Sequence, residues 1–112
     1  MIKKMVVSLL VIILFAGCEK TSGEDIFLAH IDQLEEALEH RDWDTVQNRA
    51  KGLRNMYEEN KWKLQLLGDE GEYEGLNESI NRIIAAIMEE DATNVRIEIA
   101  TARTIIKDIY SF

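Results

Sequence analysis

The fold is decided by residues 31–46, which run Ile31-Asp-Gln-Leu34-Glu-Glu-Ala37-Leu38-Glu-His-Arg-Asp42-Trp43-Asp-Thr-Val46. Apolar residues recur at steps of three and four on both sides of Asp42, which is the spacing of amphipathic helices. Asp42 follows a charged turn and precedes the second apolar series, as a helix N-cap does. The stretch therefore predicts two helices joined by a short turn, an α-hairpin.

The same pattern returns 49 residues later in the chain. The matching positions are Ile31 and Ile80, Leu34 and Ile83, Ala37 and Ala86, Leu38 and Ile87, Asp42 and Asp91, and Val46 and Val95. This internal repeat predicts a second α-hairpin, with Asp91 as the N-cap of its second helix. Because a single hairpin buries little apolar surface, we expect an all-α four-helix bundle in which the two hairpins pack together with up-down connectivity.

Four apolar stripes mark the faces that we expect to be buried. The expected core positions are Phe27, Ile31, Leu34 and Leu38; Trp43, Val46, Ala50, Leu53, Tyr57, Leu64 and Leu67; Leu76, Ile80, Ile83, Ile84 and Ile87; and Val95, Ile99, Ala102, Ile106 and Ile109. Asn60 falls on the second stripe, so we expect that helix to kink or stop there. Gly68, Gly71 and Gly75 predict a break before the third helix. Gly52 suggests the close approach of a neighbouring helix.

The N-terminal segment has the layout of a bacterial lipoprotein signal. Lys3 and Lys4 precede an apolar run that is well short of the roughly 20 residues needed to span a bilayer. Two small residues follow, and then Cys18, the only cysteine of the chain. We expect residues 1–17 to be cleaved and the Cys18 thiol to carry lipid, with palmitate-type chains holding the protein on the extracytoplasmic face of the cell membrane. An uncleaved short anchor and an ordinary secretory signal are the alternatives, and sorting between two membranes stays open.

Length and charge limit the domain organisation and the partners. We expect a signal over residues 1–17, a lipidated Cys18 with a flexible tether to residue 24, and a helical domain over residues 25–112. The chain has 21 acidic and 13 basic residues, and its net charge is −8. An acidic surface repels phosphate backbones, so we expect no nucleic-acid partner. With one cysteine, no intramolecular disulfide can form.

Asp69, Glu70, Glu72 and Glu74 form the one candidate for a cation site. Clustered carboxylates in a glycine-rich loop are ligands that Ca²⁺ accepts. The spacing departs from the EF-hand loop, because Glu74 stands where that loop requires glycine. A solvated connection between two helices is the simpler interpretation.

The histidines and tryptophans are the remaining candidates. His30 and His40 would lie about 15 Å apart on one helix, too far to share a metal ion, and we expect no metal or cofactor. Trp43 belongs to the second apolar stripe, so we expect it in the core. Trp62 falls off that stripe; we expect it to pack at the end of the bundle, with an exposed anchor for a partner as the alternative.

Three motifs beyond the N-terminal segment carry a family resemblance. They are Leu34-x-x-Ala37-Leu38-x-x-x-Asp42-Trp43-x-x-Val46, Asn60-Lys-Trp62 and Glu78-Ser79-Ile80-x-Arg82-Ile83. Together they resemble the bacterial family catalogued as domain of unknown function 4363, over nearly the whole chain. The resemblance implies a short, N-terminally anchored protein without assigned activity. Members often carry a His and acidic residues after the second tryptophan; here residues 67–75 have acids but no His, so no role for that His is carried over.

The sequence therefore favours a non-enzymatic lipoprotein that acts as a protein-interaction or envelope accessory module. No residues are spaced for nucleophilic catalysis, and lipid on Cys18 would consume its thiol. A lipoprotein that binds a cation or small ligand through residues 69–74 is the alternative.

Overall fold

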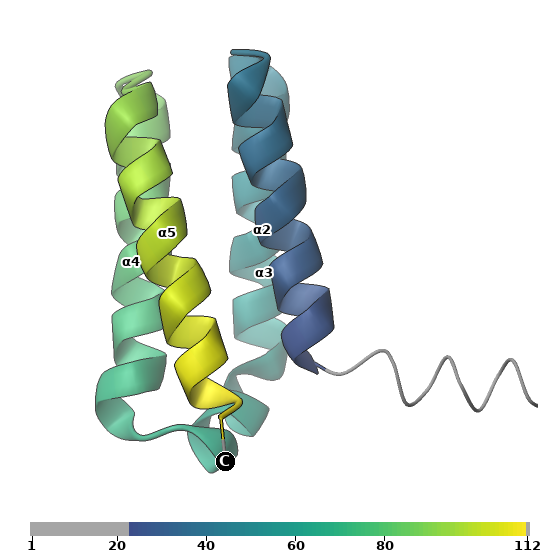
Figure 1. Ribbon diagram of the computed structural model, residues 1–112, viewed down its shortest axis with the longest axis vertical. Coiled ribbons are helices and arrows are strands. Elements are labelled where there is room, and N and C mark those ends of the chain that lie inside the picture. Colours follow the sequence, from purple (N-terminus) through teal and green to yellow (C-terminus); the bar gives the residue numbers. More distant parts are fainter. Residues whose placement is uncertain (1–22, 112) are drawn as a thin grey trace, which may run out of the picture.

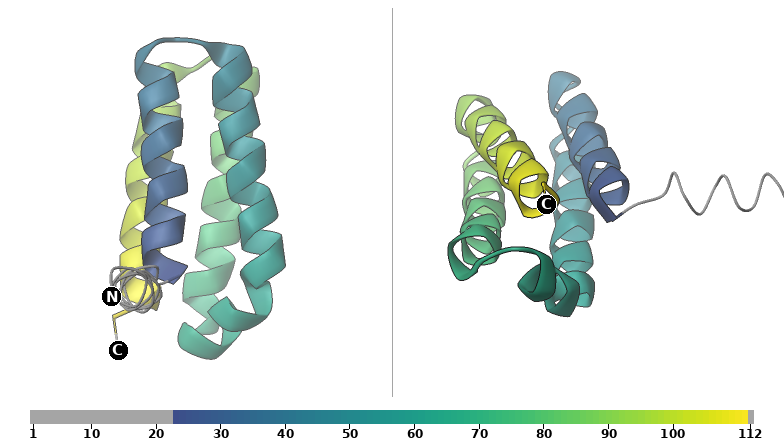
Figure 2. Two further views of the ribbon diagram at one scale, coloured as in Figure 1. Left: turned by 90° about the vertical axis from the view of Figure 1, so that its right-hand side faces the viewer. Right: turned by 60° about the horizontal axis from the view of Figure 1, so that its bottom comes forward.

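The computed structural model describes residues 23–111, which form four helices (Figure 1): α2 (Gly23–Glu39), α3 (Trp43–Leu67), α4 (Glu70–Met88) and α5 (Ala92–Ile109). Each helix contacts the next one in the chain, and α5 returns beside α2 to close a ring of contacts. Figure 2 shows that successive helices run in opposite directions. The prediction of an all-α four-helix bundle is therefore confirmed for these residues. The predicted signal and Cys18 lie outside them.

The turns after α2 and α4 end in the predicted N-caps. The carboxylate of Asp42 accepts a hydrogen bond from the backbone N–H of Thr45 at 3.4 Å, and that of Asp91 accepts one from Asn94 at 3.2 Å. The side chains of Thr45 and Asn94 donate to the same two carboxylates. Such caps pair N–H groups that a helix start leaves without a partner. Both N-cap predictions are confirmed, while an internal repeat as the origin of the two hairpins stays a prediction.

The core is built from one face of each helix, as the apolar stripes predict. The buried apolar side chains are Phe27, Ile31, Leu34, Ala37 and Leu38; Val46, Ala50, Leu53, Met56, Tyr57 and Leu64; Leu76, Ile80, Ile83 and Ile87; and Val95, Ile99, Ala102, Ile106 and Ile109. Among the predicted core positions, Trp43 and Ile84 are half-buried and pack against this cluster. Leu67 is exposed, so its prediction was wrong. No helix within residues 23–111 has both the length and the apolar character needed to cross a membrane.

The interruption predicted at Asn60 does not occur. Helix α3 continues through it to Leu67, because the Asn60 side-chain amide donates to the carbonyl oxygen of Met56 at 2.8 Å. A polar side chain on the inner face is thereby paired within its own helix. At the other boundary, α2 begins at Gly23, two residues before the predicted start of the helical domain.

The connection between α3 and α4 is shorter than the glycines in the sequence suggest. Only Gly68 and Asp69 separate α3 from α4, so Gly71 and Gly75 lie inside the first two turns of α4. Asp69 is the N-cap of α4, and this cap lets the helix begin at once. The prediction that all three glycines stand between the helices was therefore wrong.

Polar contacts also join α3 to α4 across the ring. The Arg54 guanidinium donates to the side-chain oxygen of Asn77 at 3.0 Å and to that of Asn81. The buried Tyr57 hydroxyl donates to the backbone carbonyl of Tyr73 at 3.1 Å. These contacts fix how the first pair of helices sits against the second, which positions the end of α3 described next.

Candidate functional site

The end of α3 extends beyond the start of α2. Helix α3 has 25 residues and α2 has 17, and the two run antiparallel from a shared turn. The difference in length is 25 − 17 = 8 residues, so about eight residues of α3 project past the start of α2. The left view of Figure 2 shows α3 reaching further down than α2. We call residues 60–67 the α3 tip. At 1.5 Å per residue this tip is about 12 Å long.

The α3 tip presents three large apolar side chains to solvent. The exposed fractions are 59% for Trp62, 77% for Leu66 and 38% for Leu67. Trp62 and Leu66 are four residues apart, so they lie on one face of the helix. The ammonium of Lys63 lies 5.4 Å from the centre of the Trp62 ring, within the range of a cation–π contact. The expectation that Trp62 packs in the bundle was wrong; the indole is exposed, as the alternative required.

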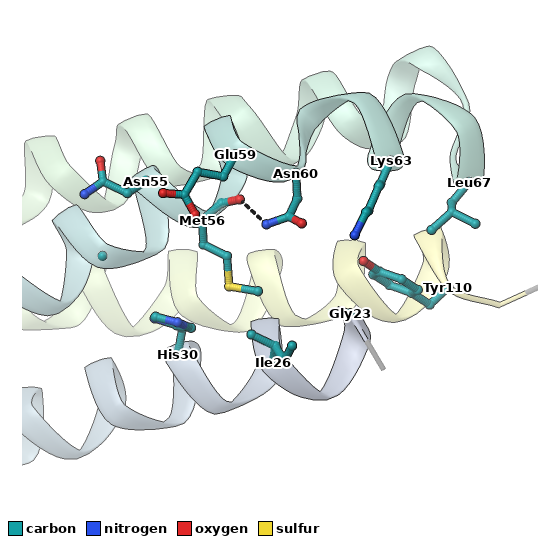
Figure 3. Close-up of a pocket in the computed structure, with 11 residues that line it drawn as sticks. Gly23, Ile26, His30, Asn55, Met56, Glu59, Asn60, Lys63, Leu67 and Tyr110 are labelled. Carbon is teal, nitrogen blue, oxygen red and sulfur yellow. Dashed lines mark hydrogen bonds between the residues drawn. The ribbon is translucent and has the colours of Figure 1, made fainter. Parts of the chain in front are cut away.

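A cleft of about 460 Å³ lies beside the α3 tip, between α2, α3 and the end of α5. Its apolar lining is Ile26, Met56, Leu67 and Tyr110, and its polar lining includes His30, Asn55, Glu59, Asn60 and Lys63. Figure 3 shows Lys63, Leu67 and Tyr110 gathered at the end of the cleft nearest Gly23. The cleft thus combines apolar and polar side chains, and it extends to Gly23 at the end of the bundle where the tip lies.

Gly23 and Tyr110 meet at this end of the cleft. A Cβ atom at position 23 would lie 2.5 Å from the Tyr110 hydroxyl oxygen, so a larger residue would displace the ring. Burial raises the pKa of the Tyr110 hydroxyl, and the charge of Glu24 adds to the rise. The start of α2 and the end of α5 are therefore packed against each other.

The acidic residues of the predicted cation site serve the start of α4. The Asp69 carboxylate accepts from the Glu72 N–H at 2.8 Å, and the Glu72 carboxylate accepts from the Asp69 N–H at 2.9 Å, a capping box. Glu70 and Glu74 are exposed. In the part of the chain that the structure describes, no three Asp, Glu, His or Cys side chains converge as metal ligands would. This arrangement favours the solvated helix connection over a cation site.

His30 lies in the middle of α2, whereas His40 lies in the turn that follows this helix. His30 is half-buried on the wall of the cleft, where its Nδ1 would lie 3.7 Å from a Cβ at Gly52. Gly52 therefore faces His30 of the neighbouring helix α2, as its position suggested. The distance from a Cβ at Gly52 to this imidazole would be an ordinary van der Waals contact. His40 is exposed beside the first turn.

A second exposed apolar site, which the sequence did not predict, lies between α3 and α4. A groove of about 100 Å³ between α3 and α4 is lined by Gln47, Ala50, Lys51, Ile84, Ile87 and Met88. Met88, the last residue of α4, is 74% exposed and lies next to the turn between α4 and α5. In the sequence, Met88 is an apolar residue that lies off the apolar stripe of its helix, and this could have indicated an exposed apolar site. We call these six residues the α3–α4 groove.

Comparison with known families places the helical domain. The family described as Domain of unknown function (DUF4363) matches residues 21–111, which include all four helices. No curated protein and no solved structure matches the chain. The match confirms the resemblance drawn from the tryptophans and the apolar stripes. The chain belongs to the DUF4363 family.

Proposed function

We propose that this protein is a non-enzymatic interaction module, held on the extracytoplasmic face of the cell membrane by lipid on Cys18. The observation that carries the proposal is the lipoprotein-type segment that ends at Cys18, five residues before the bundle begins at Gly23. One acyl chain binds a membrane marginally, whereas two or more give stable attachment. A diacylated Cys18 would therefore hold the whole domain at the surface.

The α3–α4 groove supports contact with a partner protein. Its apolar lining suits one or two apolar side chains of a partner helix. Met88 adds an unbranched side chain that adapts to different shapes, which is why methionine is frequent at binding surfaces. The net charge of −8 makes nucleic acid an unfavourable partner.

The tether is tested with Cys18→Ala in the native bacterium. Cells receive an alkyne analogue of palmitate, and the protein is then examined for label and for its distribution between membrane and soluble fractions. We expect the unchanged protein to be labelled and sedimented with membranes, and Cys18→Ala to lose the label while its helical circular dichroism is kept. A variant that stays in the membrane with residues 1–17 uncleaved would mean a short anchor instead.

The partner contact is tested with a photoreactive amino acid at Met88. The matched control places the same group at Thr104, an exposed residue of α5. Irradiation of intact cells should give one discrete adduct from position 88 and none from position 104. Replacing the half-buried Ile84 of the groove with Glu should abolish that adduct. Equal labelling from both positions, or no adduct under several growth conditions, would count against an interaction module.

A further inference from the structure

Four large apolar side chains are exposed at the end of the bundle where α2 begins. They are Ile26, which lines the cleft, and Trp62, Leu66 and Leu67 of the α3 tip. Within residues 23–111, Leu64 of the tip is buried and Leu67 lines the cleft, whereas Trp62 and Leu66 are left uncovered. Exposed apolar patches of this kind mark a surface that meets protein or membrane.

The length of the tether decides between these two occupants. Five peptide units separate Cys18 from Gly23, so their Cα atoms can be at most about 18 Å apart in any conformation. If lipid holds Cys18 at the bilayer, Gly23 stays within that distance of the surface. The α3 tip projects about 12 Å past Gly23, which spans most of the remaining gap. A folded partner would not fit between the tip and the membrane.

We propose that the α3 tip inserts Trp62 and Leu66 into the headgroup region of the membrane that carries the lipid on Cys18, so that the bundle stands end-on. This inference rests on the proposed tether. Tryptophan concentrates at membrane interfaces because its ring is apolar and its N–H is polar. Apolar side chains of interfacial segments reach about 5–10 Å into the boundary between headgroups and acyl chains.

The charges around the tip indicate whether its binding to a membrane requires anionic lipid. Lys61 and Lys63 lie on either side of Trp62, whereas Glu58 and Glu59 precede the tip and Asp69 follows it. These three acidic side chains outnumber the two lysines, so anionic lipid should give no additional attraction. Apolar insertion is therefore the driving term, and zwitterionic phosphatidylcholine should suffice.

The two tryptophans of the chain provide the test, because both belong to α3 and they lie about 29 Å apart along it. The lipidated full chain is reconstituted into phosphatidylcholine vesicles, with or without bromine on the acyl chains, and tryptophan emission is compared. In Trp43→Phe, the emission comes from Trp62 and should fall with brominated lipid, because a ring at interfacial depth lies near the acyl chains. In Trp62→Phe, the emission comes from Trp43 beside the first turn and should not change.

A matched pair of variants tests the apolar contact itself. In the Trp43→Phe background, Leu66→Asp should remove the quenching of Trp62. Gln65→Asp places the same charge on the neighbouring exposed residue and should keep most of it. All variants should float with the vesicles through their lipid. Normal flotation without quenching of Trp62, or equal quenching of both tryptophans, would overturn the end-on insertion and leave the tether intact. Loss of flotation by the unchanged chain would overturn the tether, and this inference with it.

Discussion

Arg41 and Glu90 share a left-handed backbone conformation, with φ of 54° and 51°, although 49 residues separate them. Each stands directly before the aspartate that caps the next helix, so the two turns have the same construction. A left-handed conformation costs a residue with a Cβ about 1 kcal/mol or more, a cost that glycine avoids. Both turns therefore hold strain that one substitution can remove.

Glu90→Gly should raise the free energy of unfolding by about 0.5–1 kcal/mol, because glycine adopts positive φ without the Cβ clash. Arg41→Gly should gain less, since the Arg41 guanidinium donates to the carbonyl oxygen of Leu38 at 2.7 Å and this bond would be lost. Urea denaturation followed by circular dichroism measures both. A larger gain from Arg41→Gly than from Glu90→Gly would contradict this account.

Gly52→Ala should stabilise the bundle by up to about 1 kcal/mol, the difference in helix propensity between the two residues. The added Cβ would lie 3.7 Å from Nδ1 of His30, so the cleft has room for it. Gly68→Ala is the contrasting variant, because its Cβ would lie 3.1 Å from Cγ1 of Ile109, which would have to shift. Thermal unfolding should show a rise in Tm for Gly52→Ala and none for Gly68→Ala.

Arg103 links α5 to α2, and its loss should weaken that contact. Its guanidinium lies 2.8 Å from the Asp32 carboxylate and 3.3 Å from that of Glu35. Burial alone would lower the pKa of Arg103, but the hydrogen bonds to these carboxylates outweigh it and raise the pKa. Arg103→Met should cost about 0.5–1 kcal/mol at low salt.

The ionic part of that cost should shrink at 1 M salt, where screening acts over about 3 Å. Arg96→Met is the control, because Arg96 is an exposed residue of the same helix. A double-mutant cycle with Asp32→Asn isolates the pair from the change in packing. A coupling energy near zero at low salt would show that the pair of Arg103 and Asp32 does not help to hold α5 against α2.

Tyr57 should make the bundle sensitive to alkaline pH. Burial raises the pKa of its hydroxyl, and the charge of Glu58 adds to the rise. The folded pKa of Tyr57 exceeds the unfolded value of about 10. The neutral hydroxyl therefore contributes fully to the free energy of unfolding below pH 10, and this contribution is lost as the pH rises through the folded pKa. Tyr57→Phe removes the titrating group, so its stability should fall less steeply above pH 10.

At neutral pH the same variant should be less stable by about 0.5–1.5 kcal/mol, because the hydrogen bond to the Tyr73 carbonyl is lost. Denaturation curves collected from pH 7 to pH 12 measure both effects. Parallel pH profiles for Tyr57→Phe and the unchanged chain would mean that Tyr57 does not govern the alkaline loss. Tyr110, whose pKa is also raised, would then be the next candidate.

Helical periodicity predicted most of the core because it identifies the face of a helix that can be buried. Phe27 and Ile99 were found in this way, and both are fully buried. Burial also requires a neighbour opposite that face, which depends on the lengths of other helices. Leu67 follows the stripe yet is exposed, because it lines the open cleft between α2, α3 and the end of α5. A local pattern does not contain this information.

Trp62 lies off the apolar stripe, which agrees with its exposure, although we expected it to pack at the end of the bundle. The start of α4 was also visible, because Asp69-Glu-Gly-Glu72 has the spacing of a capping box. We instead predicted a longer break, because glycine has a low helix propensity. In contrast, the cleft and the α3–α4 groove are formed by residues of separate helices. Their positions depend on packing, so spacing along one helix does not predict them.

The contact between Gly23 and Tyr110 closes the bundle into a ring, because the start of α2 and the end of α5 lie together. The order of the helices along the polypeptide is therefore not what keeps them adjacent. A circularly permuted chain that begins at Asp69, and joins residue 111 to Gly23 through a short linker, would form the same four helix pairs. The native order of the helices is thus one of several orders that would give the same ring of helix contacts.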